Sequence, residues 1–292
     1  MATHSSVRRR ATRMRALTTT MSAAIAVTLG AGWLPATSAQ ASPAHSGPVD
    51  VLFAGSLLTA MQQKIEPAFE RATGYHVVGV ANGSSALATE IKGGTQVGDV
   101  FVSASPKADA SLAGAANGRW VTSYREFGAS QLVLGYNPRS TFASLLRREP
   151  WYKVVVRPGF ILGRTDPATD PKGVLAVDAL DGVAMSYDQP TLATLATSTS
   201  NVFTETSLVG ELQAGQLDAG FFYQVEASAA HLATVPLVGT GLFAHYTVAT
   251  LKNAPHPVAA AAFIRFLLGP TGRHLLSLEG VSAIVPATTV TP

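Results

Sequence analysis

The sequence predicts an α/β protein in which helices cover a largely parallel sheet. Three apolar segments of strand character, "VDVLFA", "YHVVGVA" and "VGDVFVSAS", are separated by segments of helical character, and this alternation is typical of a parallel sheet. With 292 residues, of which 47% are hydrophobic, the chain can bury a substantial core. The first long segment, "SLLTAMQQKIEPAFERATG", ends near Gly74 and has apolar residues at helical spacing, namely Leu57, Met61, Ile65 and Phe69.

A second α/β unit follows the first. It begins with the strand candidate "QLVLGYNP" and the helix candidate "TFASLLRRE", and a loop in "RPGFILGRTDPATDPKGVLAVDAL" opens another helix. The helix in "LVGELQAGQLDAGFFYQVEASAAH" is followed by the glycine-bounded strand "AGFFY". The strand "HYTVATLKN" and the amphipathic segment "PVAAAAFIRFLLGPTGRHLLSLEG" close the chain.

The first 41 residues have the pattern of a cleaved export signal. Five arginines between positions 8 and 15 precede a mostly apolar segment at 16–34, and "SAQA" then supplies small residues two apart before Ser42. We expect cleavage after Ala41, with cleavage after Ala39 as the alternative. A transmembrane anchor is disfavoured because threonines and serine interrupt the apolar segment and a cleavage pattern follows it. Adjacent arginines also occur in twin-arginine signals, but the strongly apolar pair expected after them is missing.

Removal of this signal changes the balance of basic and acidic residues. The chain has 21 Lys and Arg against 18 Asp and Glu, and five arginines lie in the signal, so 16 basic groups remain against 18 acidic ones. The mature protein is slightly acidic, and we expect no nucleic-acid partner. Cysteine is absent, which excludes disulfides, a thiolate metal site and a cysteine lipid anchor. We expect an exported protein, whether periplasmic, cell-wall-associated or extracellular, that begins with a flexible leader at 42–48.

Three loops share one design, in which a strand ends and a helix begins at a polar or glycine-containing turn. They contain Ser56, the pair Ser84 and Ser85, and residues 170–173. Each helix start carries unpaired backbone N–H groups and the positive end of the helix dipole, which attract anions. Such starts meet at the carboxyl ends of the strands in an open α/β sheet. We therefore expect them to converge on one small anion without a lysine or arginine in direct contact. The alternative is that each serine only caps its helix.

Six segments resemble, in the same order along the chain, the molybdate- and tungstate-binding proteins of ABC importers, which belong to the two-lobed periplasmic-binding superfamily. They cover most of the mature chain. Any one of them is a weak motif, and their common order carries the resemblance. The segments are "VLFAGSLLTAMQQKIEPAFERATGYHVV", "GSSALATEIKGGTQVGDVFVSAS", "QLVLGYNPRS", "GRTDPATDPKGVLAVDAL", "LDAGFFYQVEA" and "YTVATLKNAPHPVAAAAFIRFLLGPTGRHLL".

The resemblance implies a type II periplasmic-binding-protein fold of two lobes. Each lobe would be a mixed, mostly parallel sheet flanked by helices, and a two-strand hinge would join them. The chain would cross between the lobes twice, near residues 130 and 240. Lobe I is then expected at 49–130 plus 240–292, and lobe II at 131–239.

The resemblance also implies four ligand contacts. The family's serines in the first and second loops fall on Ser56 and Ser84, a backbone donor of its third loop falls at Asp170, and a tyrosine that hydrogen-bonds the oxyanion falls on Tyr223. These residues are expected to contact an oxyanion and not to ligate a bare metal ion, and no cofactor is expected. Taken alone, Tyr223 would instead be a core aromatic residue whose hydroxyl is satisfied by the backbone.

One branch of the family adds an acidic pair that widens the coordination of the metal from four to six oxygens. Its aspartate matches Asp170, but its glutamate, just before the tyrosine, matches Phe222, and Glu226 would need a different loop path to replace it. The expectation is therefore a four-coordinate oxyanion held by hydrogen bonds. Two roles stay open for Asp170. It caps the helix that begins near Lys172 and turns its oxygens from the ligand, or it accepts a proton from a protonated oxyanion such as phosphate.

The implied function is that of a monomeric binding protein, and not an enzyme, that captures molybdate or tungstate and docks on the membrane permease of an ABC importer. Sulfate and phosphate are alternative cargoes. Ferric iron is disfavoured because phenylalanine precedes Tyr223, where iron carriers have a second tyrosine. A secreted serine hydrolase using Ser56 or Ser84 is disfavoured because the Gly-x-Ser-x-Gly elbow and a recognisable histidine triad motif are absent. The export signal and the lack of a DNA-binding domain exclude a transcription regulator.

Overall fold

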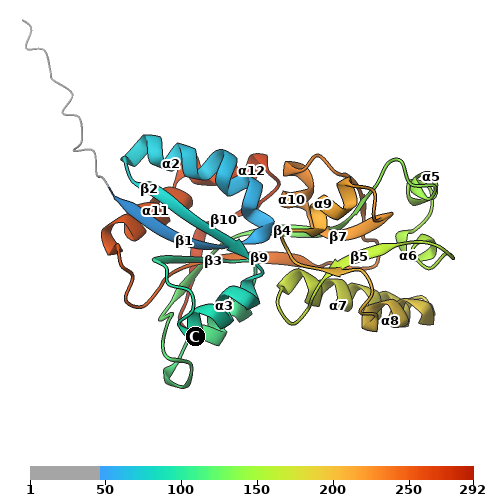
Figure 1. Cartoon of the computed structure of the whole chain (residues 1–292), viewed down its shortest axis with the longest axis horizontal. Coiled ribbons are helices and arrows are strands. Elements are labelled where there is room, and N and C mark those ends of the chain that lie inside the picture. Colours follow the sequence, from blue (N-terminus) through green and yellow to red (C-terminus); the bar gives the residue numbers. More distant parts are fainter. Residues whose placement is uncertain (1–46) are drawn as a thin grey trace, which may run out of the picture. The chain divides into compact units, whose positions relative to one another are not determined.

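The computed structural model describes residues 47–292. The predicted signal at 1–41 and all but the last two residues of the predicted leader lie outside the described residues. The described chain is an α/β structure whose strands join in a ten-stranded sheet of central order β2-β1-β3-β9-β4-β7-β5-β6, with β8 and β10 paired to β4 (Figure 1). The predicted α/β class is confirmed.

The first part of the sheet is built on parallel strands. β1 (Pro48–Ala54) lies between β2 (His76–Asn82) and β3 (Val100–Ser103) and is parallel to both. Most of β1 is buried, as expected for a strand covered on both faces. Figure 1 shows α2, α11 and α12 on one side of these strands and α3 on the other. The helices of this part are α1 (Leu58–Ala60), α2 (Glu66–Thr73), α3 (Ser84–Gly93), α4 (Pro106–Leu112), α11 (Pro257–Leu268) and α12 (Pro270–Leu278).

Two antiparallel strands continue the sheet into its second part. β4 (Tyr124–Tyr136) pairs with β9 (Phe243–Thr250) between residues 125 and 131, and with β7 (Ala219–Tyr223) between residues 132 and 136. β9 also pairs with β3, while β8 (Ala233–Pro236) and β10 (Ser282–Val290) pair with β4. β4 thus changes its partner after residue 131, and the predicted lobe limits stay a prediction.

The second part of the sheet places two helices at the ends of its strands. β5 (Leu162–Thr165) is parallel to β7 and to β6 (Val202–Phe203). α7 (Pro171–Ser186) follows β5, and α10 (Gln224–Ala229) follows β7 directly. Polar residues at these two junctions are therefore held by buried strands. The remaining helices are α5 (Ala143–Leu146), α6 (Trp151–Val154), α8 (Pro190–Thr197) and α9 (Leu208–Gln213).

The segment after β1 is a helix of changing pitch. It begins as a 3₁₀ turn, Gly55–Leu57, continues through α1 and the π-helical turn Met61–Ile65, and ends as α2 before Gly74, whose φ of 81° suits glycine. The expectation of a regular helix start at Ser56 is therefore wrong, because Ser56 lies inside the 3₁₀ turn. The four residues predicted from helical spacing to face the core are all buried: Leu57, Met61, Ile65 and Phe69.

Other predicted elements differ in extent from those observed. The strand predicted at "AGFFY" matches β7 at both limits. The helix predicted at "TFASLLRRE" is reduced to the four residues of α5. β1 begins at Pro48, which the sequence assigned to the leader. The sequence pattern does not reveal β10, because none of its nine residues is buried and it therefore lacks the apolar alternation of a half-buried strand.

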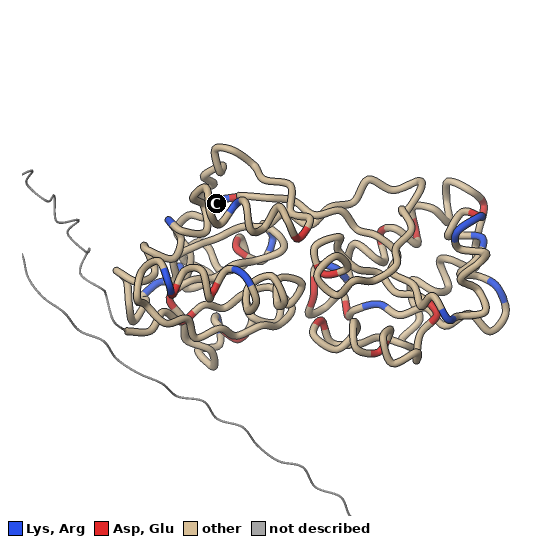
Figure 2. Tube along the Cα trace, turned by 90° about the horizontal axis from the view of Figure 1, so that it is seen from above, with Lys and Arg blue, Asp and Glu red and all other residues tan. Residues whose placement is uncertain are grey.

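Charged residues are spread over the described chain. Figure 2 shows Lys and Arg interspersed with Asp and Glu along the tube, without one basic face. Between residues 47 and 292, none of the helices combines the length and the apolar character that crossing a bilayer requires.

Two glycines of α7 test the packing of this helix. A Cβ atom on Gly173 would lie 2.6 Å from backbone atoms of residues 165–167, whereas one on Gly182 would meet nothing within 4 Å. We expect Gly173→Ala to lower the free energy of unfolding by about 1–3 kcal/mol. Gly182→Ala should raise it by about 0.5–1 kcal/mol, because alanine favours the helix. Chemical denaturation followed by circular dichroism measures both effects, and equal effects would contradict the close approach at Gly173.

Candidate functional site

Ser56, the first predicted contact, is buried in the turn after β1. Its hydroxyl oxygen lies 3.0 Å from the hydroxyl oxygen of Tyr246 on β9. Ser56 makes no helix cap, so the capping alternative is wrong for this serine. Each hydroxyl carries one hydrogen and only one of the two is used between them. The pair therefore keeps one O–H donor for a further partner.

Ser84, the second predicted contact, is buried at the start of α3. The N-cap of this helix is Gly83, and the hydroxyl oxygen of Ser84 accepts a hydrogen bond of 3.0 Å from the backbone N–H of Ala104, just after β3. A Cβ atom on Gly83 would collide with the backbone oxygen of Thr169, and the N–H of Ala86 donates to that same oxygen at 3.0 Å. The start of α3 thus packs directly on the loop before α7.

Asp170 is the N-cap of α7. Its Oδ1 accepts a hydrogen bond of 3.2 Å from the backbone N–H of Lys172, which confirms the predicted cap. Its Oδ2 is buried and has no hydrogen-bond partner among residues 47–292. Because Asp170 and Thr169 already accept N–H groups at the starts of α7 and α3, these helix starts offer fewer free donors than the sequence predicted.

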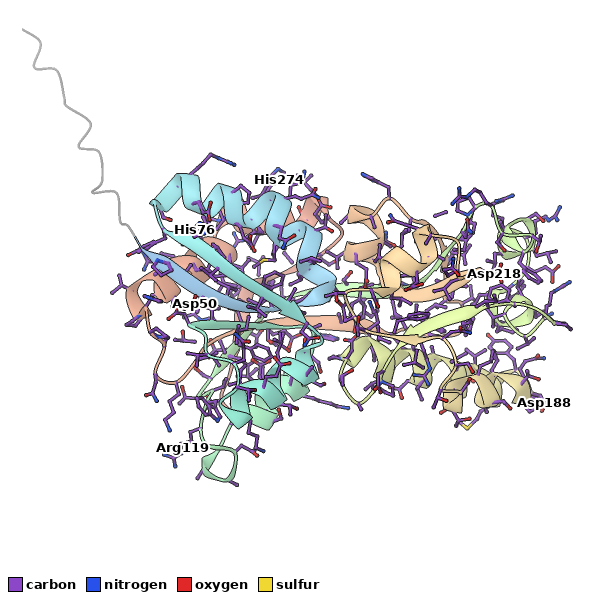
Figure 3. The ribbon with its side chains drawn as sticks, in the orientation of Figure 1. Asp50, His76, Arg119, Asp188, Asp218 and His274 are labelled. Atoms are coloured by element: carbon purple, nitrogen blue, oxygen red, sulfur yellow. The ribbon has the colours of Figure 1, made fainter. Side chains whose placement is uncertain are left out.

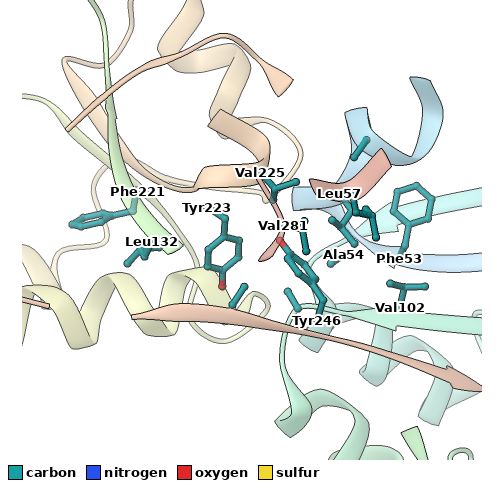
Figure 4. Close-up of a cluster of buried hydrophobic side chains, with 14 of the residues drawn as sticks. Phe53, Ala54, Leu57, Val102, Leu132, Phe221, Tyr223, Val225, Tyr246 and Val281 are labelled. Atoms are coloured by element: carbon teal, nitrogen blue, oxygen red, sulfur yellow. The ribbon is translucent and has the colours of Figure 1, made fainter. Parts of the chain in front are cut away.

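Tyr223 ends β7 and is fully buried. Its hydroxyl has no hydrogen-bond partner within the described part of the chain, so the alternative in which the backbone satisfies it is wrong. Figure 4 shows Tyr223 beside Tyr246, and their ring centroids are 6.4 Å apart in an edge-on arrangement. Since Tyr246 is hydrogen-bonded to Ser56, the ring of Tyr246 lies between the Tyr223 ring and the turn that carries Ser56. A buried hydroxyl without a partner costs about 1–3 kcal/mol, which a bound ligand can offset.

A buried ion cluster lies beside these hydroxyls. The Nζ atom of Lys172 is 3.0 Å from Oε1 of Glu205 and 2.7 Å from Oε1 of Glu226. Oε2 of Glu226 accepts the backbone N–H of Tyr223 at 3.0 Å. Oε2 of Glu205 is buried without a partner among the described residues, and a Cβ atom on Gly55 would collide with it. The Glu205 carboxylate therefore lies against the turn that carries Ser56.

Burial and neighbouring charges set the protonation of this cluster. Burial raises the pKa of Glu205 to about 8 and raises the pKa of Asp170 and of Glu226, and the charge of Lys172 opposes each rise. Burial alone would lower the pKa of Lys172, but the surrounding carboxylates, Glu205 first, raise it above the ordinary value. Burial also raises the pKa of Tyr223. Lys172 therefore stays a cation and Tyr223 stays a neutral O–H donor.

Two cavities border the site. One of about 170 Å³ is lined by Ser56, Glu205 and Glu226, among others. A larger one of about 550 Å³ is lined by neighbours of the other predicted contacts, including Ser85 and Pro171. Ser56, Glu205 and Glu226 thus border open space, whereas Ser84, Asp170 and Tyr223 line neither of these two cavities.

The described histidines lie away from the hydroxyls of the candidate serines, although His245 lines the larger cavity. The hydroxyls of Ser56 and Ser84 contact a tyrosine and a backbone amide, and between residues 47 and 292 neither is hydrogen-bonded to a histidine. Figure 3 shows His76 and His274 in the part of the molecule that carries α2 and α12. Three histidines pair with carboxylates instead: His76 with Glu70, His245 with Glu126, and His256 with Asp99.

The structure brings the predicted contacts into one region and adds residues that the sequence did not single out. Ser56 is linked to Tyr223 through Tyr246, and the start of α3 at Ser84 meets the loop that ends at Asp170. Glu226, which needed a different loop path, is buried at the start of α10 behind Tyr223. The residues that sequence reasoning missed are Tyr246, Lys172 and Glu205. For Lys172, the signal available in the sequence was a charged residue within an otherwise buried segment.

This geometry defines a class of protein. Loops from two α/β parts meet at the ends of their strands and gather buried polar groups, as in proteins that enclose a small solute between two lobes. Solved structures confirm the two-lobed fold. The periplasmic molybdate-binding protein of Azotobacter vinelandii superposes with a TM-score of 0.63 at 17% identity, over 82% of this chain and 99% of that one. The sulfate-binding protein SubI of Mycobacterium tuberculosis gives 0.63 at 15% identity, over 83% and 88%.

The chain belongs to the family of bacterial extracellular solute-binding proteins, whose profile matches residues 49–281. A relative from Haloferax volcanii, provisionally named an ABC transporter molybdenum-binding protein, is 30% identical over 67% of this chain and 62% of its own. The molybdate/tungstate-binding protein WtpA of Pyrococcus abyssi is 24% identical over 52% and 59%. These names confirm the resemblance found in the sequence. The chain spans about three fifths of the length of these curated relatives.

A pair of tyrosine substitutions tests the cluster without any ligand. Tyr223→Phe removes a hydroxyl that has no partner among the described residues, so we expect the free energy of unfolding of the purified, ligand-free protein to stay the same or rise. Tyr246→Phe, the matched control, breaks the bond to Ser56 and should lower it by about 1 kcal/mol. Urea denaturation measures both. A larger loss for Tyr223→Phe than for Tyr246→Phe would show that the Tyr223 hydroxyl has a partner within the protein.

Proposed function

We propose that this protein captures a tetrahedral oxyanion, molybdate or tungstate, outside the cytoplasm and delivers it to the membrane permease of an ABC importer. The observation that carries this proposal is the buried hydroxyl of Tyr223, unpartnered within residues 47–292, on a ring that packs against Tyr246, whose own hydroxyl is hydrogen-bonded to Ser56. Neutral O–H groups suit a fully ionised oxyanion, which accepts hydrogen bonds and donates none. The names of the relatives and of a solved structural neighbour support this choice of cargo.

The proposed contacts come from both parts of the sheet. Ser56 and Ser84 follow β1 and β2, whereas Asp170 and Tyr223 follow or end β5 and β7. Hydrogen bonds to a charged group contribute about 1.5–3 kcal/mol each, so a few of them suffice for micromolar or tighter binding. Gly55 lies against Glu205, and Gly83 lies against Thr169. We infer that the ligand enters when these loops separate and that their contact encloses it.

Two carboxylates alter the coordination that the sequence suggested. Oδ2 of Asp170 and Oε2 of Glu205 are both buried without a partner among the described residues, whereas Phe222 packs in an apolar cluster. Glu205 is thus our candidate for the second member of an acidic pair. The metal centre of molybdate or tungstate can add carboxylate oxygens to its four, but the sulfur of sulfate cannot, and a sulfate ion would only meet repulsion. We therefore favour six oxygens around the metal over a four-coordinate oxyanion.

The contacts of the candidate serines and tyrosines also bear on two alternative functions, a serine hydrolase and a ferric-iron carrier. A serine hydrolase lacks support because neither candidate serine contacts a histidine in the described chain. We propose binding without catalysis. Ferric iron is worth a direct test, since Tyr223 and Tyr246 are neighbours in space although they are distant in sequence. The hydroxyl of Tyr246 is engaged with Ser56, which argues against a tyrosine pair free to ligate iron.

Calorimetric titration of residues 42–292 tests the cargo. We expect molybdate and tungstate to bind with micromolar or tighter Kd, and sulfate, phosphate and ferric citrate to bind at least about 100-fold more weakly. The absence of heat from all five would contradict the oxyanion proposal. A preference for phosphate would instead make Asp170 an acceptor of the ligand's proton.

Substitutions of the candidate residues test which of them contact the bound oxyanion. Tyr223→Phe should weaken molybdate binding by about tenfold or more, because it removes a hydrogen bond to a charged group. Glu205→Gln should weaken molybdate binding and also narrow its preference over sulfate, since the amide repels sulfate less. Glu279→Gln, after α12, is the matched control and should change neither. A Glu205→Gln variant with unchanged selectivity would remove Glu205 from the proposed site.

Export is tested on the protein recovered from cells. We propose that the segment before residue 42 is removed on export, and that the mature protein acts as a monomer on a permease. N-terminal sequencing should give Ser42 as the first residue, or Gln40 if cleavage follows Ala39. Recovery of the protein with Met1 or Ala2 at its N-terminus, from the membrane fraction, would instead support an uncleaved anchor.

A further inference from the structure

Lys172 is enclosed behind the proposed ligand site. Its side chain has 0% exposure, and its ammonium nitrogen lies 5.5 Å and 5.9 Å from the ring centroids of Phe222 and Tyr223. The nitrogen is 3.0 Å from Oε1 of Glu205 and 2.7 and 2.8 Å from the two oxygens of Glu226. An ammonium group has three hydrogens, and these three oxygens match them. Lys172 therefore has no donor left for a ligand.

The two glutamates paired with Lys172 contact different segments of the candidate site. With Oε1 bound to the ammonium, Glu205 presents its unpartnered Oε2 to Gly55, beside Ser56. Glu226 uses Oε2 to accept the backbone N–H of Tyr223, at the position where β7 becomes α10. One buried cation thus links the carboxylate that faces the first loop to the residue whose hydroxyl is the proposed donor.

Lys172 also balances the charge of this region. Asp170, Glu205 and Glu226 are three buried carboxyl groups from three different segments, and Lys172 is the cation beside all of them. Arg164, the other buried cation in the described chain, is bonded to backbone carbonyl groups instead. Without a cation, the carboxyl groups at this depth would either take up protons or, where they are ionised, repel one another and any anion.

We propose that Lys172 is a positioning residue of the ligand site: its enclosed ammonium group orients Glu205 and Glu226 and supplies the positive charge that allows an acidic pocket to accept an anion. The inference rests on the proposed function and adds a residue that acts on the ligand only through its neighbours. It differs from a merely structural ion pair in one respect. Loss of the cation changes binding and its pH dependence, and not only stability.

The test compares Lys172→Met with Lys172→Arg in titrations with molybdate between pH 5.5 and 9.5. We expect Lys172→Met to raise Kd by about tenfold or more, since it leaves buried carboxylates unpaired. A positive charge lowers the pKa of a nearby carboxyl group, so its loss should move the midpoint of the pH profile of Kd upward by about one unit or more. Lys172→Arg keeps the charge and should restore the midpoint. Lys153→Met, on the exposed side of α6, is the matched control and should behave as the wild type.

A second variant separates binding from folding. Lys172→Met combined with Glu226→Gln removes one buried charge of each sign while leaving an acceptor for the N–H of Tyr223, so we expect its melting temperature to return toward that of the wild type. Its Kd should stay raised, because Glu205 still lacks its partner. If both the melting temperature and the Kd of the double variant recover, the positioning role of Lys172 is wrong. An unchanged pH midpoint in Lys172→Met would also contradict this role. Neither result would contradict the proposed function. A wild-type protein that binds none of the oxyanions would overturn the proposed function and this inference with it.

Discussion

The pairing of β4 with two different strands is the constraint on which the rest of the structure depends. β4 pairs with β9 through residue 131 and with β7 from residue 132 onward, so one continuous strand belongs to both parts of the sheet. This shared strand fixes where Tyr223, at the end of β7, lies relative to Tyr246 on β9. The loop after β2 then meets the loop after β5, and the loop after β1 meets the segment after β6. The polar residues of the candidate site are thus neighbours because of strand register, although they are far apart in the chain.

The candidate site consists of buried polar groups, some of which have hydrogen-bond partners within the described chain and some of which have none. Ser56, Ser84 and Glu226 have partners in the described chain, while one oxygen of Asp170, one of Glu205 and the hydroxyl of Tyr223 have none. Unpaired groups of this kind are rare in folded proteins, because each one lowers stability. Of the six such atoms in the described chain, these three lie in segments around one lysine, and a fourth, Oγ1 of Thr165, lies beside Asp170; the other two belong to Glu66 and Asp109. The gathering of most of them in one region favours ligand binding as its explanation over imperfect packing.

Much of the fold could be predicted from the sequence, because strands and helices leave periodic apolar patterns. β7 was evident from a glycine-bounded aromatic run, and the buried face of the helix after β1 was evident from its spacing. β10 could not be found in this way, since an exposed strand has no apolar pattern. Nor could the pitch changes after Gly55, which depend on how that turn packs against Glu205.

The candidate site was predictable only where a residue stood in a recognisable motif. Ser56, Ser84, Asp170 and Tyr223 could be placed by resemblance, and the cap at Asp170 followed from local chemistry. Glu205 and Tyr246 lie in segments without a motif, and only the tertiary fold brings them to the first loop. Local chemistry also misled in one respect. At the helix starts expected to have free N–H groups, some of these groups already donate hydrogen bonds to Asp170 and Thr169. Side chains therefore carry more of the proposed recognition than the backbone does.

The absence of a side chain at residue 55 has a consequence for the proposed capture of a solute. A Cβ atom there would collide with the buried carboxylate of Glu205, so even alanine would push the turn after β1 away from the segment that carries Glu205. In the proposed binding protein, glycine at this position lets the two segments come together over a captured solute with no side chain between them.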